Sequence, residues 1–362
     1  MAIASNADLL EMNQAKMAKP TITEKPLRAA IIGAGEWAQR YHFPALALLA
    51  SERAVDISGV WNRTAETAEQ VARQFSIDRV YRSFEEVLND QHIDCFVVLV
   101  NSNVLAETVW RLLVRDLPIF TEKPPGGTYR EALALSECVT VPNLVAFNRR
   151  YMPINRRFKA FADAIEGVYF AECHFYRNER LYDHFVRETG VHGINYMEYL
   201  CGPIRELHTE SGRIARNGSQ FWISSVTFES GTRGVFKFFP CCGSSIERYE
   251  VHGQETSIYL HCPQSYTSDH PGRIEVHKSG RVDSIIYDDE EGGDLLSMGI
   301  VDEYREFFAA VLHGSGTASN FANACNTMRV AEAIEAGTPL SPSSTQPECL
   351  GRSTPTRAFA ND

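Results

Sequence analysis

The stretch IIGAGEWA at residues 31–38 decides the fold class of this chain. It places Gly33, Gly35 and Ala38 in the order G-x-G-x-x-A, directly after the apolar run LRAAII and before a helical pattern. The first glycine permits a tight turn, the second lets a pyrophosphate approach the backbone, and the small third residue lets helix and strand pack closely. The stretch therefore predicts a dinucleotide-binding turn. The alternative is a glycine turn that binds no ligand.

The helix after this turn carries three further features. Glu36 and Trp37 lie at its start, and we predict that both contact the cofactor, although the indole could equally be ordinary packing. Pro44 has no amide hydrogen to donate to a helix. We therefore expect the helix to break near His42 and to restart with Pro44 in its first turn.

Short apolar runs alternate with helical patterns as far as about residue 148. These runs are LRAAIIG, VDISGVW, DCFVVLV, LPIF and LVAF. Strands separated by helices are typical of a parallel sheet with helices on its faces. Residues 27–149 are thus predicted to form a Rossmann domain of the α/β class.

From residue 150 onward the pattern changes to that of an α+β domain. The segments YFAECHFY, SQFWISSVTFE, TRGVFKFF, ERYEVHG and TSIYLH alternate apolar and polar residues, which indicates antiparallel strands with one wet face. Helical patterns occur near residues 153–165, 190–200, 299–312 and 321–336. We predict that residues 150–339 form a domain with a large open, mostly antiparallel sheet that binds substrate and mediates oligomerisation. Residues 1–26 and 340–362 lack periodicity and are expected to be flexible tails.

Composition excludes several classes of function. The chain has 362 residues, 44% of them hydrophobic, and a formal net charge of -11, so it has no basic footprint for nucleic acid. No apolar run reaches the roughly 18 residues of a membrane helix, and the first residues lack the apolar core of a signal peptide. Nine cysteines without a CxxC pair argue against zinc and against a disulfide framework. We expect a cytoplasmic protein that binds a small molecule, with no metal and no nucleic-acid or membrane partner.

The end of the second predicted strand, VWNRT, bears on the choice of dinucleotide. NAD enzymes usually place an acidic residue there to bind the ribose hydroxyls. Here Asn62 stands in its place, while Arg63 and Thr64 offer a cation and a hydroxyl to a 2'-phosphate. The segment predicts that NADP(H) is preferred and that NAD(H) is possible. The alternative is that Arg63 is a solvated residue at the start of a helix.

Four segments together make the chain resemble the Gfo/Idh/MocA family of oxidoreductases, named for glucose-fructose oxidoreductase and inositol dehydrogenase. They are the glycine turn, EKP at residues 122–124, AFNRRYMP at residues 146–153 and ETGVHGIN at residues 188–195. The last segment is similar to the family's D-x-G-x-H-x-x-D pattern. The resemblance extends over roughly residues 28–336.

Lys123 of the EKP segment follows the strand LPIFT, at the edge of the sheet where doubly wound folds bind their ligands. We expect it to face the nicotinamide, with Glu122 beside the cofactor, from a stiff turn that a trans Pro124 fixes. Partial burial would lower the pKa of the lysine. The resemblance implies that Lys123 hydrogen-bonds the reacting hydroxyl or carbonyl. The alternative is a lysine that pairs with a surface acid.

His192 is our predicted acid/base, because a reference pKa of about 6.5 suits proton transfer at working pH. Glu188 stands where the family has an aspartate, and a spacing of four residues can place it on the same helix face as the histidine. It is the third predicted catalytic residue. Asn195 replaces the second acid of the family pattern, so that carboxylate is missing. The alternative for His192 is a structural histidine on a helix.

Further site residues follow from the same resemblance. Where the family commonly reads T-P-N-x-x-H, the chain has NSNVLA at residues 101–106, and Asn101 and Asn103 are predicted to contact the cofactor. The substrate is expected to contact Lys123, Arg150, Tyr151, His192 and Asn195. Arg150 and Tyr151 are included because they can bind a sugar by hydrogen bonding and stacking, and the alternative is that both are structural residues.

These features together predict an NAD(P)-dependent dehydrogenase or reductase that acts on a secondary alcohol or ketone of a sugar, sugar derivative or cyclitol. One alternative is a glycosidase of the same fold that oxidises its sugar transiently with a tightly held NAD. Another is a non-catalytic, dinucleotide-sensing regulator, which the presence of the EKP lysine disfavours. We also expect a homo-oligomer, either a dimer or a tetramer, because a one-sided sheet leaves an apolar face for a second subunit.

Overall fold

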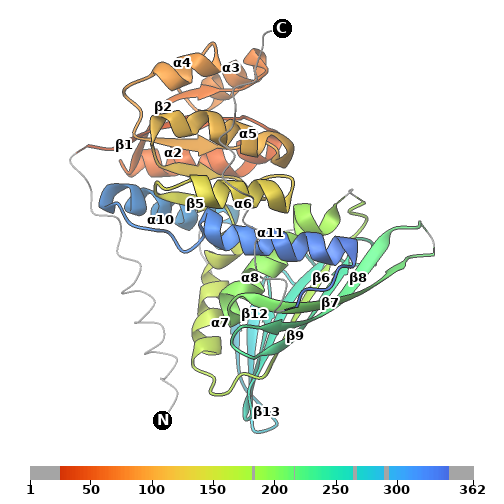
Figure 1. The fold of residues 1–362 in the computed structure, drawn as a ribbon. Coiled ribbons are helices and arrows are strands. Elements are labelled where there is room, and N and C mark those ends of the chain that lie inside the picture. Colours follow the sequence, from red (N-terminus) through yellow and green to blue (C-terminus); the bar gives the residue numbers. More distant parts are fainter. Residues whose placement is uncertain (1–24, 182–183, 216, 264–266, 289–292, 342–362) are drawn as a thin grey trace.

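The computed structural model describes residues 25–181, 184–215, 217–263, 267–288 and 293–341. Two sheets organise these residues, one of five strands and one of eight (Figure 1). Most of the two predicted tails lies outside the described residues. Leu340 is an exception, because it forms an isolated β-bridge with Leu207 and so extends the ordered fold into the predicted C-terminal tail.

The first sheet is parallel, with the strand order β2-β1-β3-β4-β5. Its strands are β1 (Leu27–Ile32), β2 (Val55–Trp61), β3 (Cys95–Val98), β4 (Ile119–Thr121) and β5 (Asn143–Val145). Every residue of β3 is fully buried, as expected for a parallel strand that is covered on both faces. The predicted Rossmann domain of the α/β class is confirmed.

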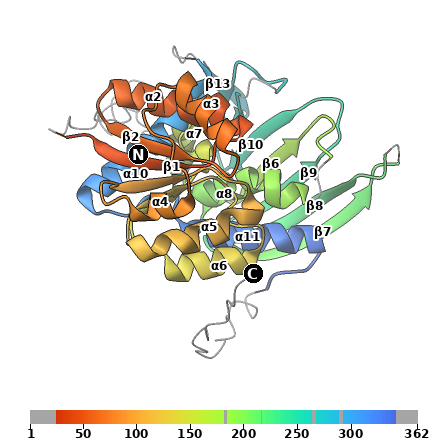
Figure 2. The ribbon, with the colours of Figure 1, turned by 90° about the horizontal axis from the view of Figure 1, so that it is seen from above.

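Helices cover both faces of this sheet (Figures 1 and 2). They are α2 (Phe43–Ser51), α3 (Ala65–Gln74), α4 (Phe84–Asn89), α5 (Ser102–Leu112) with the 3-10 turn η2 (Leu113–Arg115), and α6 (Tyr129–Cys138). Successive residues of β1 point to opposite sides, so Ile32 belongs to the core that includes α5 and α6, whereas Ile31 belongs to the core that includes α2 and α3.

The helix after the glycine turn changes its winding instead of breaking. A π-helical turn, η1 (Ala38–His42), leads directly into α2, and His42 keeps right-handed helical dihedral angles of φ -75 and ψ -47. A π-helical turn shifts the hydrogen-bond pattern by one residue, which accommodates the missing amide hydrogen of Pro44. The predicted break is wrong, although the change of winding occurs at the residue where we expected it.

The second sheet has the order β13-β12-β11-β10-β6-β9-β8-β7. Its strands are β6 (Phe170–Tyr176), β7 (Ile204–Arg213), β8 (Gln220–Phe228), β9 (Arg233–Phe239), β10 (Ile246–His252), β11 (Thr256–His261), β12 (Arg273–Lys278) and β13 (Arg281–Tyr287). The β6–β9 pair is parallel and the other neighbouring pairs are antiparallel. The predicted open, mostly antiparallel sheet is confirmed.

One face of the second sheet packs against helices, and the other is open (Figures 1 and 2). The covering elements are η3 (Asn148–Arg150), α7 (Pro153–Asp163), η4 (Val186–Gly190), α8 (Val191–Cys201) and α11 (Phe321–Ala336). The alternating residues Ala171, Cys173 and Phe175 of β6 point into this layer and are fully buried.

The open face mixes polar and apolar side chains, whereas we expected an apolar surface. A histidine–carboxylate row crosses it, formed by Glu172, His174, Glu250, His252, Glu275 and His277. Within this row, His174 Nε2 lies 2.9 Å from Glu172 Oε2. Half-buried aromatic side chains lie on the same face of the central strands, where Tyr176 of β6 packs against Phe239 of β9. The expected apolar surface is therefore present only in part.

Helix α10 (Ile300–His313), which follows α9 (Asp294–Ser297), returns the chain to the Rossmann domain (Figure 1). Its apolar face joins the core that contains α2 and α3 through Ile300, Val301, Tyr304, Phe307 and Phe308. The linear boundary at residue 149 placed this helix in the second domain, whereas its packing places it with the first.

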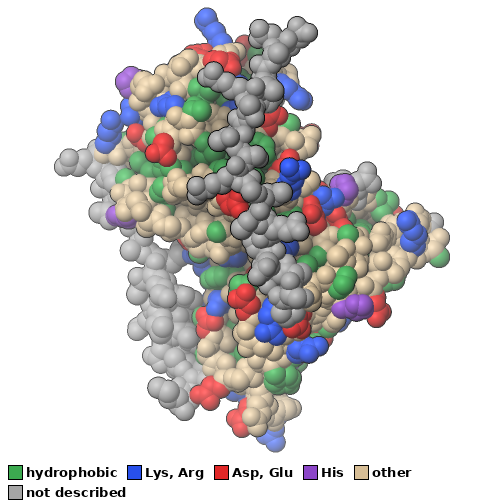
Figure 3. Space-filling view, in the orientation of Figure 1, with side chains coloured by type: hydrophobic (Ala, Val, Ile, Leu, Met, Phe, Trp, Pro, Cys, Tyr) green, Lys and Arg blue, Asp and Glu red, His purple; other side chains and the backbone are tan. Residues whose placement is uncertain are grey.

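On the molecular face shown in Figure 3, outside the grey atoms, acidic and basic side chains are interspersed. No described helix is long and apolar enough to span a bilayer.

Glu303 is a fully buried carboxyl group on α10. Neither of its oxygens has a hydrogen-bond partner among the described residues. Burial raises its pKa well above the ordinary value, and the negative charge of Glu122 acts in the same direction. Burial and Glu122 therefore both favour the protonated, neutral form of Glu303.

Replacing Glu303 by glutamine should change how stability depends on pH. Because the folded-state pKa is raised, the contribution of Glu303 is fully present below its unfolded pKa of about 4.3 and is lost as the pH rises towards its folded value, at up to about 1.4 kcal/mol per pH unit. We expect Glu303→Gln to gain free energy of unfolding relative to the wild type between about pH 5 and about pH 8. Denaturant titrations across this range measure the difference, with the exposed change Glu107→Gln as control. A constant difference would contradict the assignment.

Candidate active site

The glycine turn has room for a ligand on one side and none on the other. Gly33 has φ +102, and a side-chain carbon there would lie 2.3 Å from the carbonyl oxygen of Leu99, so that only glycine fits. At Gly35 the same test finds no atom within 4 Å. A pyrophosphate could therefore approach the Gly35 backbone at the start of the helix, and the residues present fit a dinucleotide.

Asn62 braces this turn. Its Oδ1 accepts a hydrogen bond from the Ala34 amide at 3.1 Å, and its Nδ2 donates to the Thr64 carbonyl at 3.0 Å. The carboxamide is thus engaged within the protein. Arg63 and Thr64 are exposed beside the turn, and the Thr64 side chain does not cap α3.

The remaining predicted cofactor contacts lie on the same rim. Glu36 and Trp37 are exposed, and the Trp37 ring packs against Tyr41 at a centroid distance of 4.3 Å. Asn101 and Asn103 are exposed at the start of α5, where the chain leaves β3. These side chains surround the carboxyl edge of the sheet, as the sequence suggested.

Lys123 extends from the turn that follows β4. Its Nζ donates a hydrogen bond to the backbone carbonyl of Glu188 at 2.8 Å, and the side chain is half-buried. Burial lowers the pKa of the ammonium, and the charges of Glu122 and Glu188 oppose that shift. The Lys123–Pro124 peptide bond is cis, so the expected trans proline is wrong.

Glu122 points away from the cofactor edge into a buried network. Its Oε1 lies 2.6 Å from His42 Nε2, and His42 Nδ1 lies 2.7 Å from the Tyr304 hydroxyl. Its Oε2 accepts the Lys123 amide at 2.9 Å. Burial alone would raise the pKa of Glu122, but the hydrogen bond to His42 holds it below its ordinary value. Apart from its place before Pro44, nothing in the sequence indicates this role of His42. Nothing in the sequence indicates that Tyr304 bonds to it.

His192 lies in the first turn of α8 with only 8% of its surface exposed. Its ring meets Phe147 edge to face at 6.1 Å, and Nδ1 has no hydrogen-bond partner among the described residues. Burial lowers its pKa well below the ordinary value, and the charges of Arg149 and Lys123 lower it further. The imidazole is therefore neutral at neutral pH and lies within electrostatic range of the lysine.

A buried ion cluster contributes part of this field. Glu247 accepts hydrogen bonds from Arg149 Nε at 2.9 Å, from Arg177 Nη2 at 2.7 Å and from the Tyr249 hydroxyl at 2.8 Å. Burial would raise the pKa of Glu247, but the two guanidinium groups hold it at about 2. Two cations and one anion leave a net positive charge near His192. Sequence reasoning missed this cluster, because only the pairing of β6 with β10 brings Arg177 and Glu247 together.

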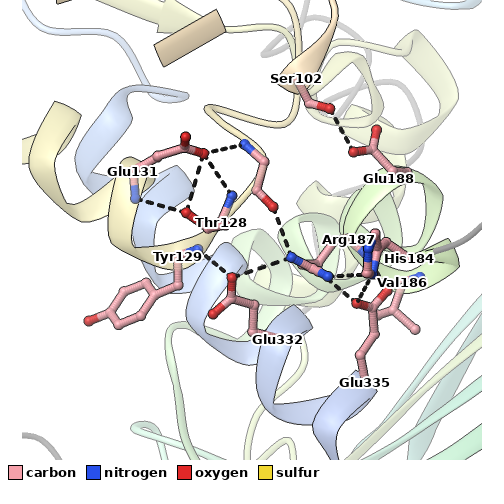
Figure 4. Close-up of polar contacts among 11 residues, drawn as sticks. Ser102, Thr128, Tyr129, Glu131, His184, Val186, Arg187, Glu188, Glu332 and Glu335 are labelled. Atoms are coloured by element: carbon pink, nitrogen blue, oxygen red, sulfur yellow. Dashed lines mark hydrogen bonds and ion pairs between the residues drawn. The ribbon is translucent and has the colours of Figure 1, made fainter. Parts of the chain in front are cut away.

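Glu188 does not lie beside His192 as we expected. Its Oε1 accepts a hydrogen bond from Ser102 Oγ at 2.7 Å (Figure 4). The physical reason is that a long carboxylate side chain takes the hydroxyl donor that packing brings within reach, here that of Ser102 on α5. Sequence spacing shows which residues share a helix face but not this partner, and the carboxylate is directed to the Rossmann domain.

Arg150, Tyr151 and Asn195 lie inside the protein and do not line an open site. Arg150 donates to Asn195 Oδ1 at 2.6 Å and to the Ala318 carbonyl at 2.6 Å. Asn195 Nδ2 donates to Thr327 Oγ1 at 3.0 Å. Tyr151 is 1% exposed and packs in the core with α10. Their predicted contact with substrate finds no support in this placement.

The turn that precedes His192 is bound between two elements (Figure 4). Arg187 donates through Nη1 to the Gly127 carbonyl at 2.9 Å and through Nε to Glu335 Oε2 at 2.6 Å. Gly127 belongs to the loop that follows Lys123, and Glu335 belongs to α11. Among the described residues, no group of three His, Cys, Asp or Glu side chains is arranged to hold a metal ion.

Comparisons with known proteins agree with this geometry. Residues 27–147 match the model of the oxidoreductase family with the NAD-binding Rossmann fold. A segment of 130 residues is 32% identical to an uncharacterized oxidoreductase of Schizosaccharomyces pombe and covers 35% of each chain. The chain thus matches about a third of the length of the first curated relatives. The scyllo-inositol 2-dehydrogenase (NAD(+)) of Bacillus subtilis is 27% identical over 260 residues, which are 66% of this chain and 74% of that protein.

Solved structures share the two-domain fold. A levoglucosan dehydrogenase in complex with NADH and levoglucosan superposes with a TM-score of 0.75 at 17% identity, covering 87% of this chain and 97% of that one. A putative NADPH-dependent oxidoreductase of Desulfitobacterium hafniense superposes with a TM-score of 0.75 at 18% identity, covering 88% of this chain and 98% of that one. The first domain therefore matches the Gfo/Idh/MocA oxidoreductase family, and the solved structures show that the described chain shares their fold across both domains.

Proposed function

We propose that the protein is a nicotinamide-dependent dehydrogenase or reductase that acts on a secondary alcohol or ketone of a sugar, sugar derivative or cyclitol. The observation that carries this proposal is the hydrogen bond between Lys123 and the segment that carries His192. They come from different domains, yet Lys123 Nζ bonds the carbonyl of Glu188, four residues before the histidine. The nicotinamide, when bound, supplies the hydride chemistry.

Lys123 is suited to bind the reacting oxygen. An ammonium group stabilises negative charge that develops on a substrate oxygen, and it does so more strongly in a site with little water. The half-burial of Lys123 and its lowered pKa also allow it to release and regain a proton more readily than a surface lysine. The Glu188 carbonyl holds Nζ in place without adding a full charge.

His192 is suited to the complementary task. A neutral imidazole can accept the proton of a substrate hydroxyl or return one to it. Burial, together with the nearby cations, favours the neutral imidazole in the resting enzyme by lowering its pKa. The lysine thus provides charge, and the histidine provides a site for the proton.

The proposed substrate class has support from two relatives. They are named scyllo-inositol 2-dehydrogenase and levoglucosan dehydrogenase, and the substrates in both names are polyhydroxylated rings. Such rings present secondary hydroxyl groups, on which an ammonium and an imidazole can act together.

We propose in addition that NADP(H) is preferred and that NAD(H) is also used. Arg63 and Thr64 are exposed beside the glycine turn, and the end of β2 has Asn62 in place of a carboxylate that would repel a 2'-phosphate. Relatives of both kinds exist, since one is named for NAD and another for NADPH.

We further propose that the protein forms a homo-oligomer through the open face of the eight-stranded sheet. The carboxylates of the histidine–carboxylate row are negative and Lys237, which pairs with Glu172, is positive, so a two-fold axis can set opposite charges against each other. Light scattering at neutral pH should give the mass of two or four chains, and a monomer would contradict the proposal.

Removing either central side chain should abolish most of the turnover. We expect Lys123→Met and His192→Ala each to lower kcat by roughly a hundredfold or more, because each removes a positioned proton-transfer group. A spectrophotometric screen of sugars, cyclitols and their keto forms with NADPH and NADH measures this. The exposed change Lys278→Met is the control. Wild-type turnover in both variants would overturn the assignment.

Arg63→Ala should weaken the discrimination between the two dinucleotides. A lost charge-assisted hydrogen bond of about 1.5–3 kcal/mol corresponds to a rise of roughly ten- to a hundredfold in the KM for NADPH, with little change for NADH. Initial rates at varied dinucleotide concentration measure both constants, and Arg73→Ala on the exposed side of α3 is the matched control. A wild-type enzyme that uses NADH far better than NADPH would refute the proposed preference.

A further inference from the structure

Glu188 joins the two domains through both its side chain and its backbone. The side-chain Oε1 accepts from Ser102 Oγ at 2.7 Å, and the backbone carbonyl accepts from Lys123 Nζ at 2.8 Å. Ser102 begins α5 directly after β3, and Lys123 follows β4. Since β3 and β4 are neighbours in the parallel sheet, one residue of the second domain binds both loops at the edge where ligands bind.

The position of Glu188 determines the position of His192. The chain between them stays helical: Gly190 has φ -62 and ψ -23, and Val191 has φ -51 and ψ -31. The turn η4 and the helix α8 therefore continue as one stiff segment. A displacement of Glu188 from Ser102 would move the imidazole relative to the Lys123 ammonium.

Among the described residues, the Glu188 carboxylate has no hydrogen bond to Lys123 Nζ or to the His192 ring. Its Oε1 accepts from Ser102, while His192 Nδ1 has no hydrogen-bond partner there. Its influence on Lys123 is through space, because its charge is one of two that raise the lysine pKa against burial. The carboxylate is thus placed to hold the site together and to keep Lys123 charged, without exchanging protons with the substrate.

We propose that Glu188 is a positioning residue whose bond with Ser102 fixes the His192 segment against the Lys123 loop, and that the proton of the reaction does not pass through its carboxylate. The proposal rests on the function proposed above for Lys123 and His192. It assigns to Ser102 a part in catalysis that it performs only through Glu188.

Two variants separate the positioning role from proton transfer. Glu188→Gln keeps an oxygen that can accept from Ser102 but cannot act as a general base, whereas Ser102→Ala keeps the carboxylate but removes its anchor. We expect kcat to fall by roughly tenfold or more in Ser102→Ala and in Glu188→Ala. Glu188→Gln should keep most of the wild-type kcat, because it keeps the bond with Ser102. The double variant Ser102→Ala/Glu188→Ala should be no worse than Glu188→Ala alone, because the Ser102 hydroxyl acts only through the Glu188 side chain.

The pH profile adds a readout that a purely structural defect would not move. Glu188→Gln removes a charge that raises the Lys123 pKa, so the alkaline limb of kcat should shift to lower pH. The control Ser51→Ala removes a hydroxyl that bonds only the Leu48 carbonyl of its own helix, and it should match the wild type. A Glu188→Gln variant as inactive as Glu188→Ala, together with full activity of Ser102→Ala, would overturn the proposal.

Hydrogen exchange tests the same bond without turnover. In the cofactor-free protein, Ser102→Ala should speed amide exchange across residues 186–192 by roughly tenfold relative to Ser51→Ala. Unchanged exchange would refute the positioning role. A wild-type enzyme without activity on any polyol would instead refute the proposed function, and the exchange result would still decide the role of the Ser102–Glu188 bond.

Discussion

The structure depends on one hydrogen bond between domains, from the Lys123 ammonium to the carbonyl of Glu188. A half-buried ammonium needs an acceptor, because removing a charge from water without a partner costs several kcal/mol. The acceptor here is a backbone oxygen of the segment that carries His192. The same contact that stabilises the lysine therefore also places the histidine.

Two further sets of contacts keep this bond in register. Before Lys123, Glu122 accepts the lysine amide and is itself bonded to His42 of the helix after the glycine turn, whose other ring nitrogen bonds Tyr304 of α10. After Lys123, the Gly127 carbonyl accepts from Arg187. The loop is thus fixed on both sides, and one of these contacts connects it to the cofactor-binding turn. Behind the histidine, Glu247 and its two arginines add positive charge that keeps the imidazole neutral.

Much of the fold could be predicted from local patterns. The glycine turn, the five parallel strands and the open sheet follow from residue spacing and alternation, which are properties of neighbouring residues. The return of α10 to the first domain could not be predicted in this way, because an apolar stripe shows that a helix packs but not against which core. The charge of the open face was missed for a related reason, since alternation shows which residues point outward but does not weigh how histidines and carboxylates pair across strands.

The candidate site was predictable where chemistry depends on a single segment. Lys123 and His192 came from motifs, and the structure brings them together, although their roles stay predictions. Glu188, Arg150 and Asn195 were assigned from their local sequence segments, and each makes its contacts with residues distant in the sequence: Ser102, Ala318 and Thr327. A π-helical turn also cannot be read from composition. Hydrogen-bond partners at such separations are fixed by the packing of whole elements.

The most direct test is a crystal structure of the protein with a bound nicotinamide dinucleotide and a polyol substrate. The account predicts that the Lys123 ammonium and the His192 imidazole both lie within hydrogen-bond reach, about 3 Å, of the reacting oxygen, on the same side of the nicotinamide ring. A nicotinamide bound away from the Lys123 loop, or a substrate oxygen that contacts neither group, would contradict it.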